Sequence, residues 1–360
     1  MQGRGEQRMR MAESRRTDPA SPAVDRPRSS GPLAVLYTGG TFGMVPSAQG
    51  LIPNPHLREE VEGLMADARG ADGGPLAWVY SATASAVDSA EMDDEALGRL
   101  ADQLREIIAR HDPRGVVVIH GSDTLAYSAA FAAFALADLP TPIVFTGAQR
   151  PLGAEGSDAV DNLSLAVAAA DRDAPHGVHI AFGGSLLPAV RATKRSTQSL
   201  RAFAAPRSLA ESPTGVDRRL AAALREAAGT PSPRTGLVKV SPGLSAAQLV
   251  AALEECPTGI VLECYGSGTA PAVSGGLLGP IRTATARGTV VLAVTQCEHG
   301  PVVLDRYAVG SALADAGAIG GGDMTSEAAL GKLGALVRAG VVGDELGELL
   351  ALNLIGERRG

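Results

Sequence analysis

Residues 33–41 of the chain, LAVLYTGGT, join a β-rich run to a turn that contains two glycines. Glycine lets the backbone turn tightly and approach a ligand closely. Thr41, which ends the turn, is expected at an exposed position, where its hydroxyl either acts as a nucleophile or caps the turn.

The run LAVLYT belongs to a series in which β-rich stretches alternate with Ala- and Leu-rich stretches whose apolar residues recur at helical spacing. The predicted strands are 33–38, 76–81, 115–120, 142–147 and 177–184, and the predicted helices are 93–111, 124–137 and 157–171. This alternation predicts a parallel sheet that is covered by helices on both faces.

A segment rich in Pro, Gly and Ser separates this series from a second one, and it is predicted to be a linker at 206–235 with a short helix at 217–228. The second series has predicted strands at 235–240, 258–265 and 289–296, helices between them, and a long helical tail from about 325. The sequence therefore predicts two α/β lobes. The larger, N-terminal one (32–205) is expected to have a flavodoxin-like or Rossmann-like parallel sheet, and the smaller, C-terminal one spans 236–360. Residues 1–31, which lack apolar periodicity, are expected to form a disordered tail.

The composition argues against several classes of protein. The net charge is −7 and the body of the chain has no basic stripe, so no nucleic-acid binding is expected. The cysteines (Cys256, Cys264 and Cys297) form no CxxC pair, so neither a disulfide framework nor a zinc site is expected. No window offers the roughly 18 uninterrupted apolar residues of a membrane helix. Because no apolar region follows Arg15-Arg16, no secretory signal is expected, and the predicted location is cytoplasmic.

Two further polar loops follow predicted strands. In the loop that begins at His120, Ser122 and Asp123 offer a hydroxyl and a carboxylate side by side, which are either site residues or the N-cap of the next helix. His120 itself is expected to be a packing group rather than a general base. The third loop runs from Thr146 to Pro151 and continues to Ser157, Asp158 and Asn162. Ligands of such sheets bind beyond the carboxyl ends of the strands, where these loops gather.

Taken together, these loops resemble the motifs of one family in their order along the chain. The stretches are TGGTFGM (38–44), HGSDTLAYSAA (120–130), TGAQRPLGAEGSDAVDNL (146–163), RATK (191–194), FAAP (203–206), CYGSGTAP (264–271), TQC (295–297) and AGAIGGGDM (316–324). The chain resembles the bacterial-type L-asparaginase family, and specifically its cytosolic branch. The resemblance covers almost everything after the N-terminal tail.

The resemblance implies a role for each matching residue. The family's nucleophile falls on Thr41, and its hydroxyl–acid pair falls on Ser122 and Asp123, with serine in place of the usual threonine. The motif lysine falls on Lys194, which in its neutral form can draw a proton through the Ser122 hydroxyl. The implied activity is hydrolysis of L-asparagine to L-aspartate and ammonia, with no metal or organic cofactor.

The resemblance also implies how the substrate is bound. Its binding segment falls on Asp88 and Ser89, and Ser89 is expected to bind the substrate α-carboxylate while Asp123 binds the α-ammonium group. Ser122 is expected to take part in both binding and catalysis. The family's sites lie between subunits, so a homodimer or homotetramer is expected.

The chain departs from the family pattern at two positions. Leu51 occupies the place of a loop tyrosine that assists the nucleophile, and no tyrosine occurs from 42 to 79. Loss of such an acid–base group can cost on the order of 10²–10⁴ in rate. Thr269 replaces an asparagine that reaches a neighbouring subunit, which bears on the preference between asparagine and glutamine.

Two alternatives to an asparaginase stay open. One is a glutaminase or another side-chain amidase of the same family. An amidotransferase subunit is disfavoured, because the polar tail is too short to be the extra β-rich domain of that protein. The other alternative is a degenerate member that binds and senses asparagine or aspartate. Leu51 favours the sensor, whereas Thr41, Asp123 and Lys194 favour catalysis.

Overall fold

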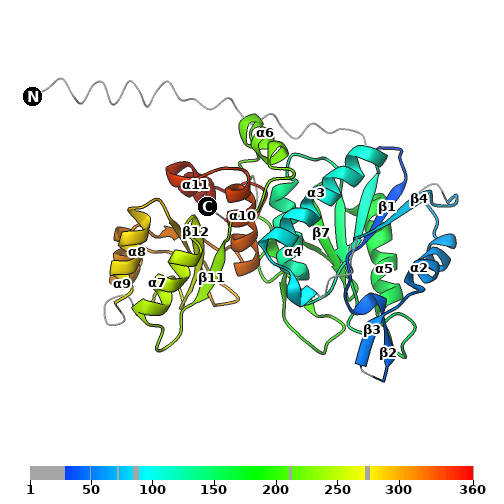
Figure 1. The fold of residues 1–360 in the computed structure, drawn as a ribbon, viewed down its shortest axis with the longest axis horizontal. Helices are drawn as coiled ribbons and strands as arrows, with labels where there is room; N and C mark the ends of the chain where they lie inside the picture. The colour runs from blue at the N-terminus through cyan, green and yellow to red at the C-terminus, as the bar shows by residue number, and fades with distance from the viewer. Residues whose placement is uncertain are drawn as a thin grey trace, which may run out of the picture.

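The computed structural model describes residues 29–48, 50–70, 73–83, 89–210, 213–271 and 276–359 of the chain. They form two α/β lobes that lie side by side (Figure 1). The two lobes agree with the prediction from the alternation of strands and helices. The tail predicted at 1–31 lies outside the described residues except for 29–31.

The N-terminal lobe is built on a six-stranded sheet with the order β4-β1-β5-β6-β7-β8. Its strands are β1 (Leu33–Tyr37), β4 (Trp78–Ala82), β5 (Gly115–Ile119), β6 (Ile143–Thr146), β7 (Val178–Phe182) and β8 (Ser185–Pro188). The first five in the sheet are parallel, in the 2-1-3-4-5 chain order of flavodoxin-like folds. β8 pairs antiparallel to β7, which the sequence analysis did not predict.

Helices cover both faces of this sheet, as predicted (Figure 1). They are α2 (Leu57–Ala66), α3 (Asp94–His111), α4 (Leu125–Ala135) and α5 (Ala159–Ala168), and α5 continues into a π-helical turn, η3 (Ala169–Asp173). Ala34 and Leu36 of β1 pack on the face of α3 and α4, and Leu33 and Val35 pack on the opposite face. β1 is therefore buried on both sides, which explains its continuous apolar run.

α4 is apolar around its whole circumference because a helix of the C-terminal lobe packs on its outer side. That helix is α10 (Ser326–Arg338), which lies beside α4 in Figure 1. A side chain at Gly331 would come within 2.7 Å of the Phe131 backbone nitrogen, so the glycine permits the close approach. The two lobes thus share one packed interface.

The C-terminal lobe contains a four-stranded parallel sheet with the order β11-β12-β13-β14. Its strands are β11 (Gly236–Lys239), β12 (Gly259–Cys264), β13 (Val290–Thr295) and β14 (Ile319–Gly320), and its helices before α10 are α7 (Ala246–Glu255), α8 (Leu278–Thr285) and α9 (Ala308–Asp315). The linker carries α6 (Arg218–Glu226), within the range predicted for a short helix. The domain limits 32–205 and 236–360 stay a prediction.

The helical tail predicted from about residue 325 is confirmed, and it consists of two helices, α10 and α11 (Gly343–Ala351). Gly340, after α10, and Gly343, the first residue of α11, have φ values of 77° and 61°. These left-handed conformations end one helix and redirect the chain into the next. No helix in the described ranges is long and apolar enough to cross a membrane.

A buried ion pair fixes the chain beyond α11 to α10. Lys332 Nζ lies 2.6 Å from Glu357 Oε1, and both side chains are 0% exposed. The Glu357 carboxylate also accepts hydrogen bonds from the backbone nitrogens of Leu354 and Ile355. Burial lowers the pKa of Lys332 to about 8, against the opposing effect of Glu357. Each charge therefore depends on the other.

Removal of one partner is expected to destabilise the fold strongly. Lys332→Met leaves the Glu357 carboxylate buried without its counter-ion, so the free energy of unfolding should fall by about 3–5 kcal/mol. The double variant Lys332→Met/Glu357→Gln should lose less than the sum of the two single variants. Urea unfolding of the four proteins measures both effects, and additive losses would contradict the coupling.

Candidate functional site

The loops predicted to form a site meet at the carboxyl ends of β1 and β5, which are neighbours in the sheet. The strand order reverses between these two strands, and this switch point is where flavodoxin-like folds bind their ligands. Thr41 follows β1, whereas Ser122 and Asp123 follow β5. Of the three predicted loops, two therefore lie on either side of the expected crevice.

The turn after β1 approaches the loop after β5 at backbone distance. Gly40 has φ 90°, and a side chain there would overlap the backbone of Gly121. Thr41 begins the 3-10 turn η1 (Thr41–Gly43), whose N-cap is Gly40. Among the described residues, the Thr41 hydroxyl has no hydrogen-bond partner, so the structure gives it no capping role.

Ser122 and Asp123 do not cap the helix that follows them. The N-cap of α4 is Thr124, and the Thr124 hydroxyl donates to the Ser89 carbonyl at 2.7 Å. Lys194 Nζ instead donates to Ser122 Oγ at 2.9 Å and to Asp123 Oδ1 at 2.7 Å. The amine of Lys194 thus bridges the hydroxyl and the carboxylate.

Lys194 reaches this position from a distant part of the chain. It lies in β9 (Thr193–Lys194), which pairs antiparallel with β10 (Phe203–Ala204) after the 3-10 turn η4 (Ala189–Arg191). Residues 194–198 also line an open surface hollow of about 380 Å³. The lysine therefore contacts the hydroxyl–carboxylate pair and also borders this hollow.

Ser89 lies against the same loops, in the 3-10 turn η2 (Ser89–Glu91). It is buried, and a side chain at Gly121 would overlap the Ser89 hydroxymethyl group. Thr41, Ser89, Ser122, Asp123 and Lys194 are thus gathered around the backbone of Gly40 and Gly121. Asp88, the remaining predicted site residue, lies outside the described residues.

The third predicted loop supports the site through Gln149, for which the sequence analysis gave no role. Ser122 Oγ donates to Gln149 Oε1 at 3.4 Å, and Gln149 Nε2 donates to the Ser199 carbonyl at 3.2 Å. The buried Asp158 carboxylate accepts from the backbone nitrogen of Gln149 at 3.0 Å. Asn162 donates to Asp158 at 2.9 Å and to the Gly147 carbonyl at 3.0 Å. The sequence signal for this support was the polar continuation of the loop through Asp158 and Asn162.

His120 is a packing group in the structure, as predicted. Its Nδ1 donates to the Gly121 carbonyl at 2.8 Å, and burial lowers its pKa to about 4. The ring is therefore neutral at physiological pH. Because it is fully buried, it lacks the access to solvent that a general base needs.

The region after Thr41 contains a β-hairpin of β2 (Met44–Ser47) and β3 (Gly50–Pro53). Leu51 lies in β3 opposite Pro46, and its side chain is 48% exposed. The Tyr37 ring packs against the η1 turn. It lies so close to Gly43 that a side chain at that glycine would overlap the Tyr37 hydroxyl. Burial raises the pKa of Tyr37 to about 12, so its phenol stays protonated.

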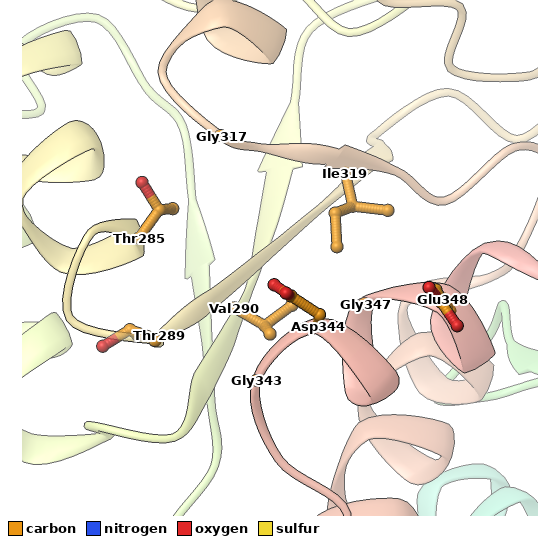
Figure 2. Close-up of a pocket in the computed structure, with 10 residues that line it drawn as sticks. Thr285, Thr289, Val290, Gly317, Ile319, Gly343, Asp344, Gly347 and Glu348 are labelled. Atoms are coloured by element: carbon orange, nitrogen blue, oxygen red, sulfur yellow. The ribbon is translucent and has the colours of Figure 1, made fainter. Parts of the chain in front are cut away.

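Another cavity, of about 390 Å³, is lined by none of the predicted site residues. Figure 2 shows it between α8, the start of β13 and α11, where Asp344 and Glu348 are its charged residues. Val290 lies at the amino end of β13, away from the carboxyl edge where polar loops gather. Within the part of the chain that the structure describes, no group of His, Cys, Asp or Glu side chains is arranged to hold a metal ion.

Two family models match the chain. "Asparaginase, N-terminal" matches residues 32–216, and "Glutaminase/Asparaginase C-terminal domain" matches residues 234–350. The L-asparaginase 1 of Escherichia coli (strain K12) is 34% identical over 335 residues, which cover 90% of this chain and 97% of that protein.

Two other proteins widen the comparison. The crystal structure of L-asparaginase I from Vibrio cholerae is 27% identical, with a TM-score of 0.74 over 92% of this chain and 100% of that one. The 60 kDa lysophospholipase of Homo sapiens is 34% identical over 359 residues, which cover 92% of this chain and 62% of that protein. The chain belongs to the bacterial-type L-asparaginase family and is a hydrolase that acts on amides.

Proposed function

We propose that the protein hydrolyses L-asparagine to L-aspartate and ammonia with Thr41 as the nucleophile. The bridge of Lys194 to Ser122 Oγ and Asp123 Oδ1, at 2.9 Å and 2.7 Å, is the observation that carries this proposal. The L-asparaginases among the relatives support the substrate. The Thr41 hydroxyl, which has no hydrogen-bond partner among the described residues, supports the choice of nucleophile.

In the proposed reaction, Thr41 Oγ attacks the side-chain amide carbon of asparagine and gives up its proton. The C–N bond then breaks and the nitrogen leaves as ammonia after gaining a proton. Water hydrolyses the resulting ester, which releases aspartate and restores the hydroxyl. Lys194 in its neutral form accepts a proton from Ser122 Oγ, and Asp123 orients the amine. Ser122 thus relays protons between the reacting groups and the lysine.

The same residues are proposed to bind the substrate backbone. Ser89 binds the α-carboxylate, and Asp123 binds the α-ammonium group, with Ser122 beside it. Asp88 belongs to the same substrate-binding segment as Ser89. The Asp123 side chain is 67% exposed, which leaves it open to a ligand. Charge-assisted hydrogen bonds of this kind select a free amino acid over a peptide, which lacks one or both charges. Backbone N–H groups near Thr41 and Ser122 stabilise the oxyanion.

We also propose that the protein is a cytoplasmic homodimer or homotetramer. The free thiols of Cys256, Cys264 and Cys297 support a reducing compartment. The exposure of Asp123 at the site edge supports a neighbouring subunit that covers it. Thr269, whose backbone pairs with Tyr265, is the position from which that subunit would contact the site.

Thr41→Ala is expected to abolish turnover but keep binding. Loss of a nucleophile should lower ammonia release from L-asparagine by roughly 10⁴-fold or more. The variant should still gain thermal stability with asparagine, by about 2.7 kcal/mol at 100 times the dissociation constant. The control is Thr230→Ala, at an exposed threonine of the linker turn. Equal activity of Thr41→Ala and wild type would reject Thr41 as the nucleophile.

Lys194→Arg tests whether the lysine must lose its proton. Arginine keeps the positive charge but cannot be deprotonated at working pH, so kcat should fall by on the order of 10²–10⁴. Lys239→Arg is the matched control, because Lys239 is 63% exposed in β11 and should tolerate the change. Steady-state ammonia release measures both variants. Unchanged kcat in Lys194→Arg would show that Lys194 acts only as a fixed charge.

Leu51→Tyr separates a slow enzyme from a sensor of asparagine. If the missing phenol limits the rate, the variant should raise kcat by about 10²-fold or more. Leu51→Phe adds the ring without the hydroxyl and is the matched control. Calorimetry that finds tight asparagine binding, with no ammonia release by wild type or Leu51→Tyr, would favour the sensor. Comparison of L-asparagine with L-glutamine in the same assay tests the glutaminase alternative.

A further inference from the structure

Lys194 lies in a short segment that buried arginines hold at both ends. This segment, residues 189–207, is here called the lysine hairpin, and it contains η4, β9 and β10. Arg191 lies just before β9, and Arg207 lies just after β10. Only Lys194–Phe203 and Thr193–Ala204 pair in the two-stranded ladder. So small a ladder cannot fix the position of the lysine by itself.

Both arginines donate to the same oxygen atom in the other lobe. Arg191 Nη1 donates to the Asp323 carbonyl at 3.0 Å, and Arg207 Nη1 donates to the same carbonyl at 2.8 Å. Asp323 lies between β14 and α10. We call Arg191, Arg207 and Asp323 the arginine clamp. It ties the two ends of the lysine hairpin to one point of the C-terminal lobe.

The Asp323 side chain adds a buried charge pair to the clamp. Arg191 Nη1 lies 3.2 Å from Asp323 Oδ1, and the Arg191 side chain is 0% exposed. Arg191 Nε also donates to the Gly356 carbonyl at 2.9 Å, whereas its Nη2 is a buried atom without a partner among the described residues. The same carboxylate accepts from the Arg359 backbone nitrogen at 2.7 Å.

The clamp is a costly way to stabilise a fold. Two buried guanidinium groups share one nearby carboxylate, and a well-packed apolar cluster of the same size would be at least as stable. Buried ionic groups are useful where geometry must be fixed, because their hydrogen bonds are directional. Lys194 is such a case, since its amine must lie within hydrogen-bond distance of both Ser122 and Asp123.

We propose that Arg191, Arg207 and Asp323 are positioning residues that set the place of Lys194, so that the C-terminal lobe controls the geometry of a site built on the N-terminal lobe. The clamp touches no reacting group and acts through the backbone of the lysine hairpin. The kinetic part of this inference rests on the proposed catalytic role of Lys194. The structural part does not.

Asp323→Asn tests the clamp with a minimal change in shape. It removes the counter-ion of Arg191 but keeps the carbonyl that both arginines use. We expect kcat for asparagine to fall on the order of 10- to 100-fold, since small displacements of a catalytic group are enough for such losses. KM should change by less than about threefold. Arg191→Lys, which keeps the charge but loses the fork of donors, should show the same pattern more weakly.

The matched control is Asp138→Asn. Asp138 is also a buried carboxylate, 1% exposed, and it pairs with Arg105 at 2.8 Å away from the lysine hairpin. This control should lower the melting temperature without lowering kcat. If Asp323→Asn and Asp138→Asn lose stability alike and both keep the kcat of wild type, the clamp is structural only and the proposal fails.

A readout that needs no activity uses the scarcity of lysine. The chain contains only Lys194, Lys239 and Lys332, so selective ¹³Cε labelling gives three lysine signals, and Lys194→Arg identifies one of them. The chemical shift of the Lys194 signal should change in Asp323→Asn and stay the same in Asp138→Asn. If wild type is inactive but this signal moves in Asp323→Asn, the proposed function is rejected and the clamp is supported. An unchanged Lys194 signal in Asp323→Asn would reject the clamp, whatever the activity.

Discussion

The contact between Gly40 and Gly121 is the constraint on which the site depends. A side chain at Gly40 would overlap the backbone of Gly121, and one at Gly121 would overlap Ser89. Only glycine at both positions lets the loops after β1 and β5 meet at backbone distance. This contact brings Thr41 next to Ser122 and Asp123 at the switch point of the sheet. The rigid parallel strands beneath the loops then hold the arrangement in place.

Lys194 joins this arrangement from outside the sheet, and its position depends on more remote contacts. In the antiparallel pair β9–β10, Lys194 lies opposite Phe203, and Thr193 Oγ1 donates to Glu327 of α10 at 2.6 Å. The Arg191–Asp323 contact adds an anchor in the C-terminal lobe. α10 also packs against α4, the helix that begins directly after Ser122 and Asp123. Hence α10 and the loop before it contact both halves of the site.

The buried polar network around Asp158 illustrates why some conspicuous residues are structural. The Asp158 carboxylate accepts hydrogen bonds from the backbone nitrogens of Gln149 and Arg150 and from the Asn162 amide. Such a network fixes the loop after β6, because each unsatisfied member would be costly in a buried setting. His120 is equally buried and is kept neutral. The site therefore combines groups that can react, at the crevice, with groups that only hold loops in place.

The sequence by itself determined the two α/β lobes, because apolar periodicity is a local signal, and the resemblance of its strand-end loops to one family pointed to the residues of the candidate site. It missed the antiparallel β8, the break between α10 and α11 and the hairpin β2–β3, where short strands and glycines leave only weak patterns. Ser122 and Asp123 remained ambiguous between a helix cap and a site until Thr124 proved to be the cap. Only the tertiary structure decided that Lys194 bridges Ser122 and Asp123. It also decided that Arg191 and Arg207 both bind Asp323. Each of these contacts joins residues more than 70 positions apart in the chain, and no local sequence pattern encodes a contact over such a separation.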